Sequence, residues 1–138
     1  MWVVYALLSA LFAALTAIFS KIGVAGISSN LATAIRTVVI LVLVWGIVLA
    51  KGEQRELGLV SKHSLFFLII SGIATGLSWL FYFKALQIGE VSKVAPVDKL
   101  SVALVIVLSA LFLGEPMTTK TWLGAGLIVA GTLVLTWK

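Results

Sequence analysis

The chain has 138 residues, of which 62% are hydrophobic and 11% charged, with a formal net charge of +5. Its mean hydropathy of +1.21 lies far above the usage of soluble domains and predicts an integral membrane protein. The chain has no cysteine, which excludes disulfides, thiolate metal sites and a cysteine nucleophile. Because the positive charge lies near predicted helix ends, it favours contact with anionic lipids and not with nucleic acid.

Five apolar stretches are long enough to cross about 30 Å of hydrocarbon as helices, which takes about 20 residues each. They cover residues 2–20, 29–50, 64–86, 94–113 and 121–137. Residues 38–44 are apolar on every side, unlike the alternating strands of a membrane barrel. The sequence therefore predicts an all-α membrane protein with five transmembrane helices and short loops, forming a single domain over residues 1–138. We expect it in the inner membrane of the cell.

The first stretch has the length of a signal peptide, but its flanking charges are reversed. No Lys or Arg precedes it and Lys21 follows it, whereas a signal peptide begins with positive charge. We therefore expect residues 2–20 to be retained as a helix.

Polar residues follow one face of the first and third predicted helices. In the first helix they are Tyr5, Ser9, Thr16 and Ser20. In the third helix they are Ser71, Thr75, Ser78 and Tyr82. At 100° per residue, each set falls on one face of its helix. Small polar residues can also join helices without lining anything, so a single stripe leaves both interpretations open. Several stripes together predict a shared polar cavity.

Charged residues inside the predicted spans strengthen this prediction, because a charge at a helix centre costs roughly 2.5 to 3.5 kcal/mol. Arg36 lies about 12 Å into the second helix, and Asp98 and Lys99 lie near the start of the fourth. Both helices start from the same membrane face, so Arg36 and Asp98 lie at depths that allow an ion pair between them. The alternative for Arg36 is that its long side chain reaches the headgroups.

Lys84 and Lys99 lie near the ends of predicted helices. Lys84 lies opposite the polar stripe of the third helix and near its end, so we expect it to anchor at the headgroups. Lys99 is offset by about 100° from Asp98, which fits either a headgroup contact or a cavity wall.

The distribution of Lys and Arg predicts weak orientation in the membrane. Loops on the amino-terminal side carry Lys51, Arg55, Lys62 and Lys120. The opposite side carries Lys21, Lys93 and Lys138, and also Lys84 and Lys99 if these reach the interface. Orientation follows an imbalance of these residues, so near equality predicts that both insertions occur.

The sequence also resembles a known family. FYFKAL at residues 81–86, a proline near the start of helix four, LGEP at residues 113–116, a glycine-rich last helix and Arg36 are similar to an EamA domain of the drug/metabolite transporter superfamily. Many members have ten helices in two inverted halves, and this chain resembles one half. The segment GLIVAG at residues 126–131 is similar to the dimerising last helix of small multidrug resistance proteins.

This resemblance implies a secondary transporter that works by alternating access. A chain that is one half can rebuild the inverted pair of halves by pairing with an oppositely inserted copy. We therefore expect a homodimer, in an antiparallel arrangement, in contact with membrane lipids. Its interface is predicted at Gly124, Gly126 and Gly131.

The intramembrane charges are neutral to positive overall, which suits a small zwitterionic or anionic metabolite, similar to an amino acid. Small multidrug resistance proteins use an acidic residue in the first helix, and this chain has none there, which argues against simple exchange of cations for protons. The predicted coupling residue is Asp98. The predicted substrate-binding residues are Tyr5, Ser9, Thr16, Arg36, Ser78, Tyr82, Asp98 and Lys99.

Two other functions stay open. Short relatives in the same superfamily are subunits in lipid-linked sugar translocation, and a basic pocket near one face could hold a lipid phosphate. The chain could also be a membrane partner that transports nothing itself. An enzyme is the least expected, because the spans have no facing carboxylates and the chain has a single histidine, His63. We predict no cofactor and no metal site.

Overall fold

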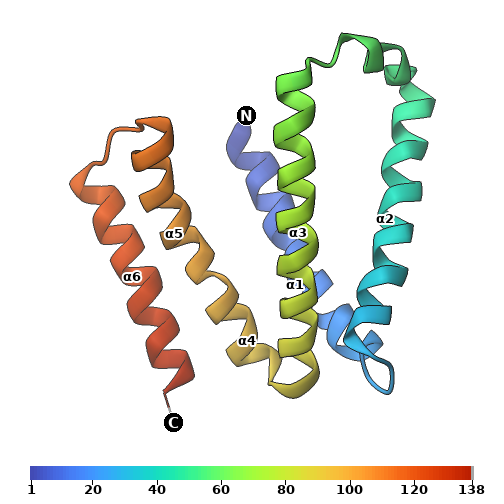
Figure 1. Ribbon diagram of the computed structural model, residues 1–138. Coiled ribbons are helices and arrows are strands. Elements are labelled where there is room, and N and C mark those ends of the chain that lie inside the picture. Colours follow the sequence, from blue (N-terminus) through green and yellow to red (C-terminus); the bar gives the residue numbers. More distant parts are fainter. Residues whose placement is uncertain (138) are drawn as a thin grey trace. The chain divides into compact units, whose positions relative to one another are not determined.

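The computed structural model describes residues 1–137, which form helices joined by short connections (Figure 1). The helices are α1 Trp2–Gly23, α2 Ser29–Lys51, the short 3₁₀ helix η1 Glu53–Leu59, α3 Lys62–Ile88, α4 Val91–Asp98, α5 Leu100–Leu108, the π-helical turn η2 Ser109–Leu113 and α6 Thr119–Thr136. Five spans are long and apolar enough to cross a membrane, the fourth being Val91–Leu113. The predicted all-α membrane fold is confirmed, and the chain is a multi-pass membrane protein.

The helix ends extend beyond several of the predicted bounds. The first helix ends at Gly23 and not at residue 20, the third covers Lys62–Ile88 and not 64–86, and the fourth span begins at Val91 and not at residue 94. Each extension adds Lys or other polar residues to an apolar stretch. The backbone hydrogen bonds continue through these residues because long side chains at a helix end reach the headgroups without unwinding the helix.

Local caps decide where α2 begins and ends. The Ser28 hydroxyl accepts a hydrogen bond from the Leu31 N–H at 3.2 Å, which satisfies one free donor of the first turn. At the other end Gly52 adopts a φ of 75°, a left-handed conformation that glycine tolerates best. The connection that follows carries Glu53, Arg55 and Glu56 and folds into η1 before α3 starts.

The chain divides into two compact units. We call Phe19–Gln87 the central unit, and Met1–Ile18 together with the segment from Ile88 onward the terminal unit. The central unit therefore contains the end of α1 with α2 and α3, whereas the terminal unit contains the rest of α1 with α4, α5 and α6.

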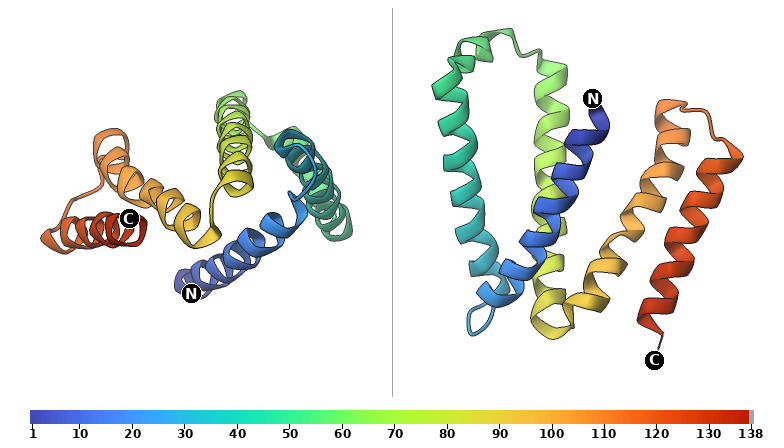
Figure 2. Two further views of the ribbon diagram at one scale, coloured as in Figure 1. Left: turned by 90° about the horizontal axis from the view of Figure 1, so that it is seen from below. Right: turned by 180° about the vertical axis from the view of Figure 1, so that it is seen from behind.

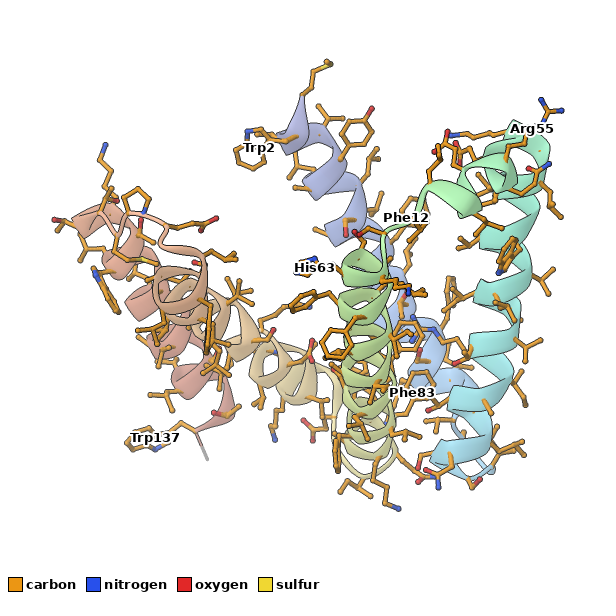
Figure 3. The ribbon with its side chains drawn as sticks, turned by 45° about the horizontal axis from the view of Figure 1, so that its top comes forward. Trp2, Phe12, Arg55, His63, Phe83 and Trp137 are labelled. Carbon is orange, nitrogen blue, oxygen red and sulfur yellow. The ribbon has the colours of Figure 1, made fainter. Side chains whose placement is uncertain are left out.

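The core of the central unit lies where α1 ends, α2 begins and α3 ends. Val24, Ala32 and Phe83 are buried against one another, and Tyr82 packs partly buried against them. Figure 3 shows Phe83 between α2 and α3. Gln87 ties α3 to the connection after α1, because its side-chain amide donates to the Ile27 carbonyl at 2.8 Å. Most apolar side chains further along α2 and α3 are exposed, as expected for surfaces that meet lipid or another chain.

In the terminal unit, α6 lies alongside α4 and α5 (Figure 2). Ala125 and Thr132 are its buried residues. The Thr132 hydroxyl donates to two carbonyl oxygens, that of Ile128 at 2.9 Å in its own helix and that of Pro96 at 3.2 Å in α4. Since a hydroxyl has one proton, the two acceptors share it.

The fourth span is interrupted at Lys99. Pro96 lies inside α4, not near its start as predicted. Proline has no N–H, so it removes the hydrogen bond to the carbonyl of residue 92 and destabilises the helix there. The Lys99 N–H is shared between the carbonyls of Ala95 at 3.2 Å and Pro96 at 3.1 Å, and a new helix starts at Leu100. The Pro96 carbonyl thus accepts from both Lys99 and Thr132.

We predict that Thr132→Val destabilises the protein, because it removes the side-chain hydrogen bond between α6 and the interrupted span. The loss should be about 0.6 to 1.7 kcal/mol, the range of interhelical hydrogen bonds in membrane proteins. Thr136→Val is the matched control, since the Thr136 hydroxyl bonds only to carbonyls of its own helix. Unfolding in mixed micelles, followed by circular dichroism, measures both variants. Equal effects would show that the Pro96 contact contributes nothing.

Candidate functional site

Arg36 is the charged residue placed deepest in the central unit. It lies in the second turn of α2, about 10 Å from the start of that helix. Its guanidinium carbon is 4.3 Å from the centre of the Trp79 ring and 5.4 Å from that of Phe83. Trp79 and Phe83 are one turn apart on α3, so they face the same side of that helix. The rings attract the cation through their negative faces, which joins α2 to α3.

Cation–π contacts such as those of Arg36 need none of its N–H donors. Within the described central unit, its guanidinium pairs with no carboxylate, because the acidic residues Glu53 and Glu56 lie in η1, at the other end of α2. Tyr82 lies close enough to Arg36 to interact with it electrostatically. A guanidinium carries its N–H donors in its plane, in a fork that fits a carboxylate or phosphate. An arginine stacked on aromatic rings can therefore still bind an anion at its edge.

The structure brings together only part of the predicted set in the central unit. Tyr82 is half-buried beside the core, in range of Arg36, whereas Ser78 is exposed. The rings of Trp79 and Phe83 were not predicted as site residues. The signal available was their spacing of four residues opposite an intramembrane arginine, but the sequence does not say which face of α3 turns toward α2.

In the terminal unit, Asp98 and Lys99 form an ion pair at 3.2 Å at the interruption of the fourth span. The side chain of Asp98 is 34% exposed and that of Lys99 is 56% exposed. Neighbouring residues of a helix point about 100° apart, and the long side chain of Lys99 spans this separation to reach Asp98. The predicted Arg36–Asp98 pair joins residues of different units and stays a prediction.

The predicted residues of α1 differ in burial. Tyr5 and Ser9 are exposed, whereas Thr16 is half-buried and is followed by the buried Ala17. Their role in binding stays a prediction.

The glycines of α6 lie on open surfaces. A Cβ placed at Gly124, Gly126 or Gly131 would meet no atom within 4 Å. These positions are therefore available to another molecule, and their role as a dimer interface stays a prediction.

The fold is that of a small helical membrane protein with an arginine held between two of its spans. Residues 1–137 match the EamA-like transporter family. The chain therefore belongs to this family of transporters.

Similar proteins support this assignment. An "uncharacterized transporter in cobO 3'region" from Sinorhizobium sp. is 51% identical over 134 residues, which cover 97% of this chain and 95% of that protein. A "probable 4-amino-4-deoxy-L-arabinose-phosphoundecaprenol flippase subunit ArnE" from Yersinia pseudotuberculosis is 32% identical over 85 residues, covering 62% of this chain and 71% of that protein. No solved structure matches the chain.

Proposed function

We propose that this protein is a secondary transporter of a small zwitterionic or anionic metabolite, similar to an amino acid, in which Arg36 binds the anionic group. The geometry of Arg36 carries this proposal. Its guanidinium is stacked on Trp79 and faces no carboxylate of the described central unit. The aromatic face reduces the cost of the charge in hydrocarbon, while the donors at its edge serve a carboxylate or phosphate. Membership of the EamA-like transporter family supports the transport function.

The interrupted fourth span supports a role for Asp98 in coupling. Irregular points in the spans of secondary transporters hold substrates and coupling ions, and Pro96 makes such a point because it leaves the carbonyl of residue 92 without its helical N–H partner. Asp98 lies at the break with Lys99 as its partner. Asp98 is the one Asp or Glu within the five spans, which supports the proposal that it couples transport.

The assembly that we propose is an antiparallel homodimer. An oppositely inserted copy would supply the inverted half on which alternating access depends. The near balance of Lys and Arg on the two sides supports dual insertion. Gly124 and Gly131 are seven residues apart and so lie on one face of α6, with open space around them. This supports contact with a second chain, because glycine allows close approach of helices. Gly126 lies on the other side of α6, where it lines a groove with Ala103 and Val107 of α5.

The similarity to ArnE supports a second candidate, a subunit of a flippase for a lipid-linked sugar. A lipid phosphate is also an anion that Arg36 could bind. The two candidates differ in what purified protein does alone. A homodimeric transporter moves a water-soluble metabolite into liposomes, whereas a flippase subunit or a membrane partner without transport activity moves none.

The first test concerns Arg36. Radiolabelled amino acids and organic acids, offered singly to liposomes containing the purified protein, should identify a transported compound. Arg36→Gln should then lower kcat/KM about 10- to 100-fold, the value of a lost hydrogen bond to a charged group. Arg36→Lys should restore only part of it, because an ammonium lacks the planar fork. Arg55→Gln, which removes the other arginine of the chain at an exposed site, should leave transport unchanged. Equal rates in wild type and Arg36→Gln would refute the proposed site.

The second test concerns coupling. Asp98→Asn should abolish accumulation driven by a pH gradient while leaving the protein folded, because an amide cannot exchange the proton. Glu90→Gln is the control, since Glu90 is an exposed carboxylate paired with Lys93 at 3.2 Å. Accumulation in liposomes and elution volume on gel filtration are the two measurements. Wild-type accumulation in Asp98→Asn would show that Asp98 has a structural role and no role in coupling.

The third test concerns topology. The chain has no native cysteine, so Ser61→Cys and Ala25→Cys, at exposed sites in connections at opposite ends of α2, can each be labelled from outside intact cells. Dual insertion predicts that each site labels in about half of the molecules. Full labelling of one site and none of the other would contradict the antiparallel dimer and favour a separate partner.

A further inference from the structure

A groove of about 460 Å³ lies in the central unit between the start of α2 and the end of α3. Its lining residues are Ser28, Ser29, Asn30, Leu77, Leu80, Phe81, Lys84 and Gln87. The α3 residues among them fall on one face of the helix, and Trp79 and Phe83 lie about 120° away from the centre of this face. The groove is therefore separate from the Arg36 site.

The polar end of the groove is built around Lys84. The Lys84 ammonium donates to the Gln87 side-chain oxygen at 3.4 Å, and the Gln87 amide donates to the Ile27 carbonyl at 2.8 Å. Gln87 thus holds Lys84 near the connection between α1 and α2. The position is about one turn before the end of α3, so the ammonium reaches the level of the lipid headgroups.

Within the central unit, the charged residues at this end are all positive. No Asp or Glu occurs between residues 19 and 52 or between residues 57 and 87, so the acidic residues of the central unit lie only in η1. Lys21 and Lys84 belong to the end of the unit that carries the groove, and the Lys21 ammonium donates to the Leu86 carbonyl there. The mouth of the groove is complementary to an anion.

The other part of the groove is apolar. Leu77, Leu80 and Phe81 continue from Lys84 toward the middle of α3, and Phe81 is 73% exposed. An inorganic anion would use only the polar end. A molecule with an anionic head and a hydrocarbon tail uses both parts of the groove, because its tail makes close van der Waals contacts with these apolar side chains.

We infer that this groove binds an anionic phospholipid, with its phosphate at Lys84 and one acyl chain along Leu77, Leu80 and Phe81. The site is independent of the substrate proposed for Arg36. Bound lipid would bridge α2 and α3 at one membrane face, beside the core of Val24, Ala32 and Phe83, and so stabilise the central unit.

Native mass spectrometry of the purified protein, titrated with phosphatidylglycerol or phosphatidylcholine, tests this site. Lys84→Gln should weaken phosphatidylglycerol binding about fivefold, the effect of one basic side chain next to an anionic lipid, and leave phosphatidylcholine binding unchanged. Lys84→Arg should retain binding. Lys93→Gln is the matched control, because it removes one positive charge on the same membrane side but outside the groove. Equal losses in Lys84→Gln and Lys93→Gln would overturn the site in favour of general surface charge.

A second pair of variants tests the apolar wall. Leu77→Ser should weaken phosphatidylglycerol binding about threefold through lost van der Waals contact with the acyl chain, whereas Leu68→Ser, exposed on the opposite side of α3, should not. Displacement of the lipid by millimolar inorganic phosphate would overturn the lipid assignment in favour of a free anion. Loss of dimers in Lys84→Gln, with lipid binding intact, would show that a second copy occupies the groove.

Discussion

The hydrocarbon environment sets the constraint on which the structure depends, because it offers no water to backbone N–H and C=O groups. Helices satisfy these groups internally, and the interruption of the fourth span shows what happens where a helix cannot. Pro96 removes one hydrogen bond, the Lys99 N–H is shared between two carbonyls, and the Thr132 hydroxyl reaches the Pro96 carbonyl from α6. A polar side chain of one span thereby adds a hydrogen bond to a backbone carbonyl of another.

The same environment explains the surroundings of Arg36. A guanidinium between apolar helices needs a partner, and here Trp79 and Phe83 supply aromatic faces. Rings stabilise the charge without neutralising it, unlike a carboxylate, which would also occupy the donors. The central unit therefore keeps a cation whose edge remains suited to an anion, and the groove at Lys84 adds positive charge at the end of the same pair of helices.

Much of the fold could be predicted from hydropathy and helical period, and the deviations have local causes. The five spans were predicted correctly, but α1, α3 and the fourth span extend past the predicted bounds because lysines near helix ends remain helical. Pro96 was predicted near a helix start, where proline is tolerated. It lies inside α4 instead, because that helix already begins at Val91. Arg36 was predicted as a site residue from its depth in the span, whereas Trp79 and Phe83, which contact it, were not predicted as site residues.

The sequence by itself determined the membrane class, the number of spans, the intramembrane charges and the resemblance to the EamA family, because each is a property of single segments or local motifs. The tertiary structure decided which rings face Arg36, how Lys99 and Thr132 satisfy the backbone at Pro96, and where Lys84 closes a groove. These features depend on the rotation of one helix against another. That rotation is set by packing between residues distant in the chain, which the period of a single helix does not specify.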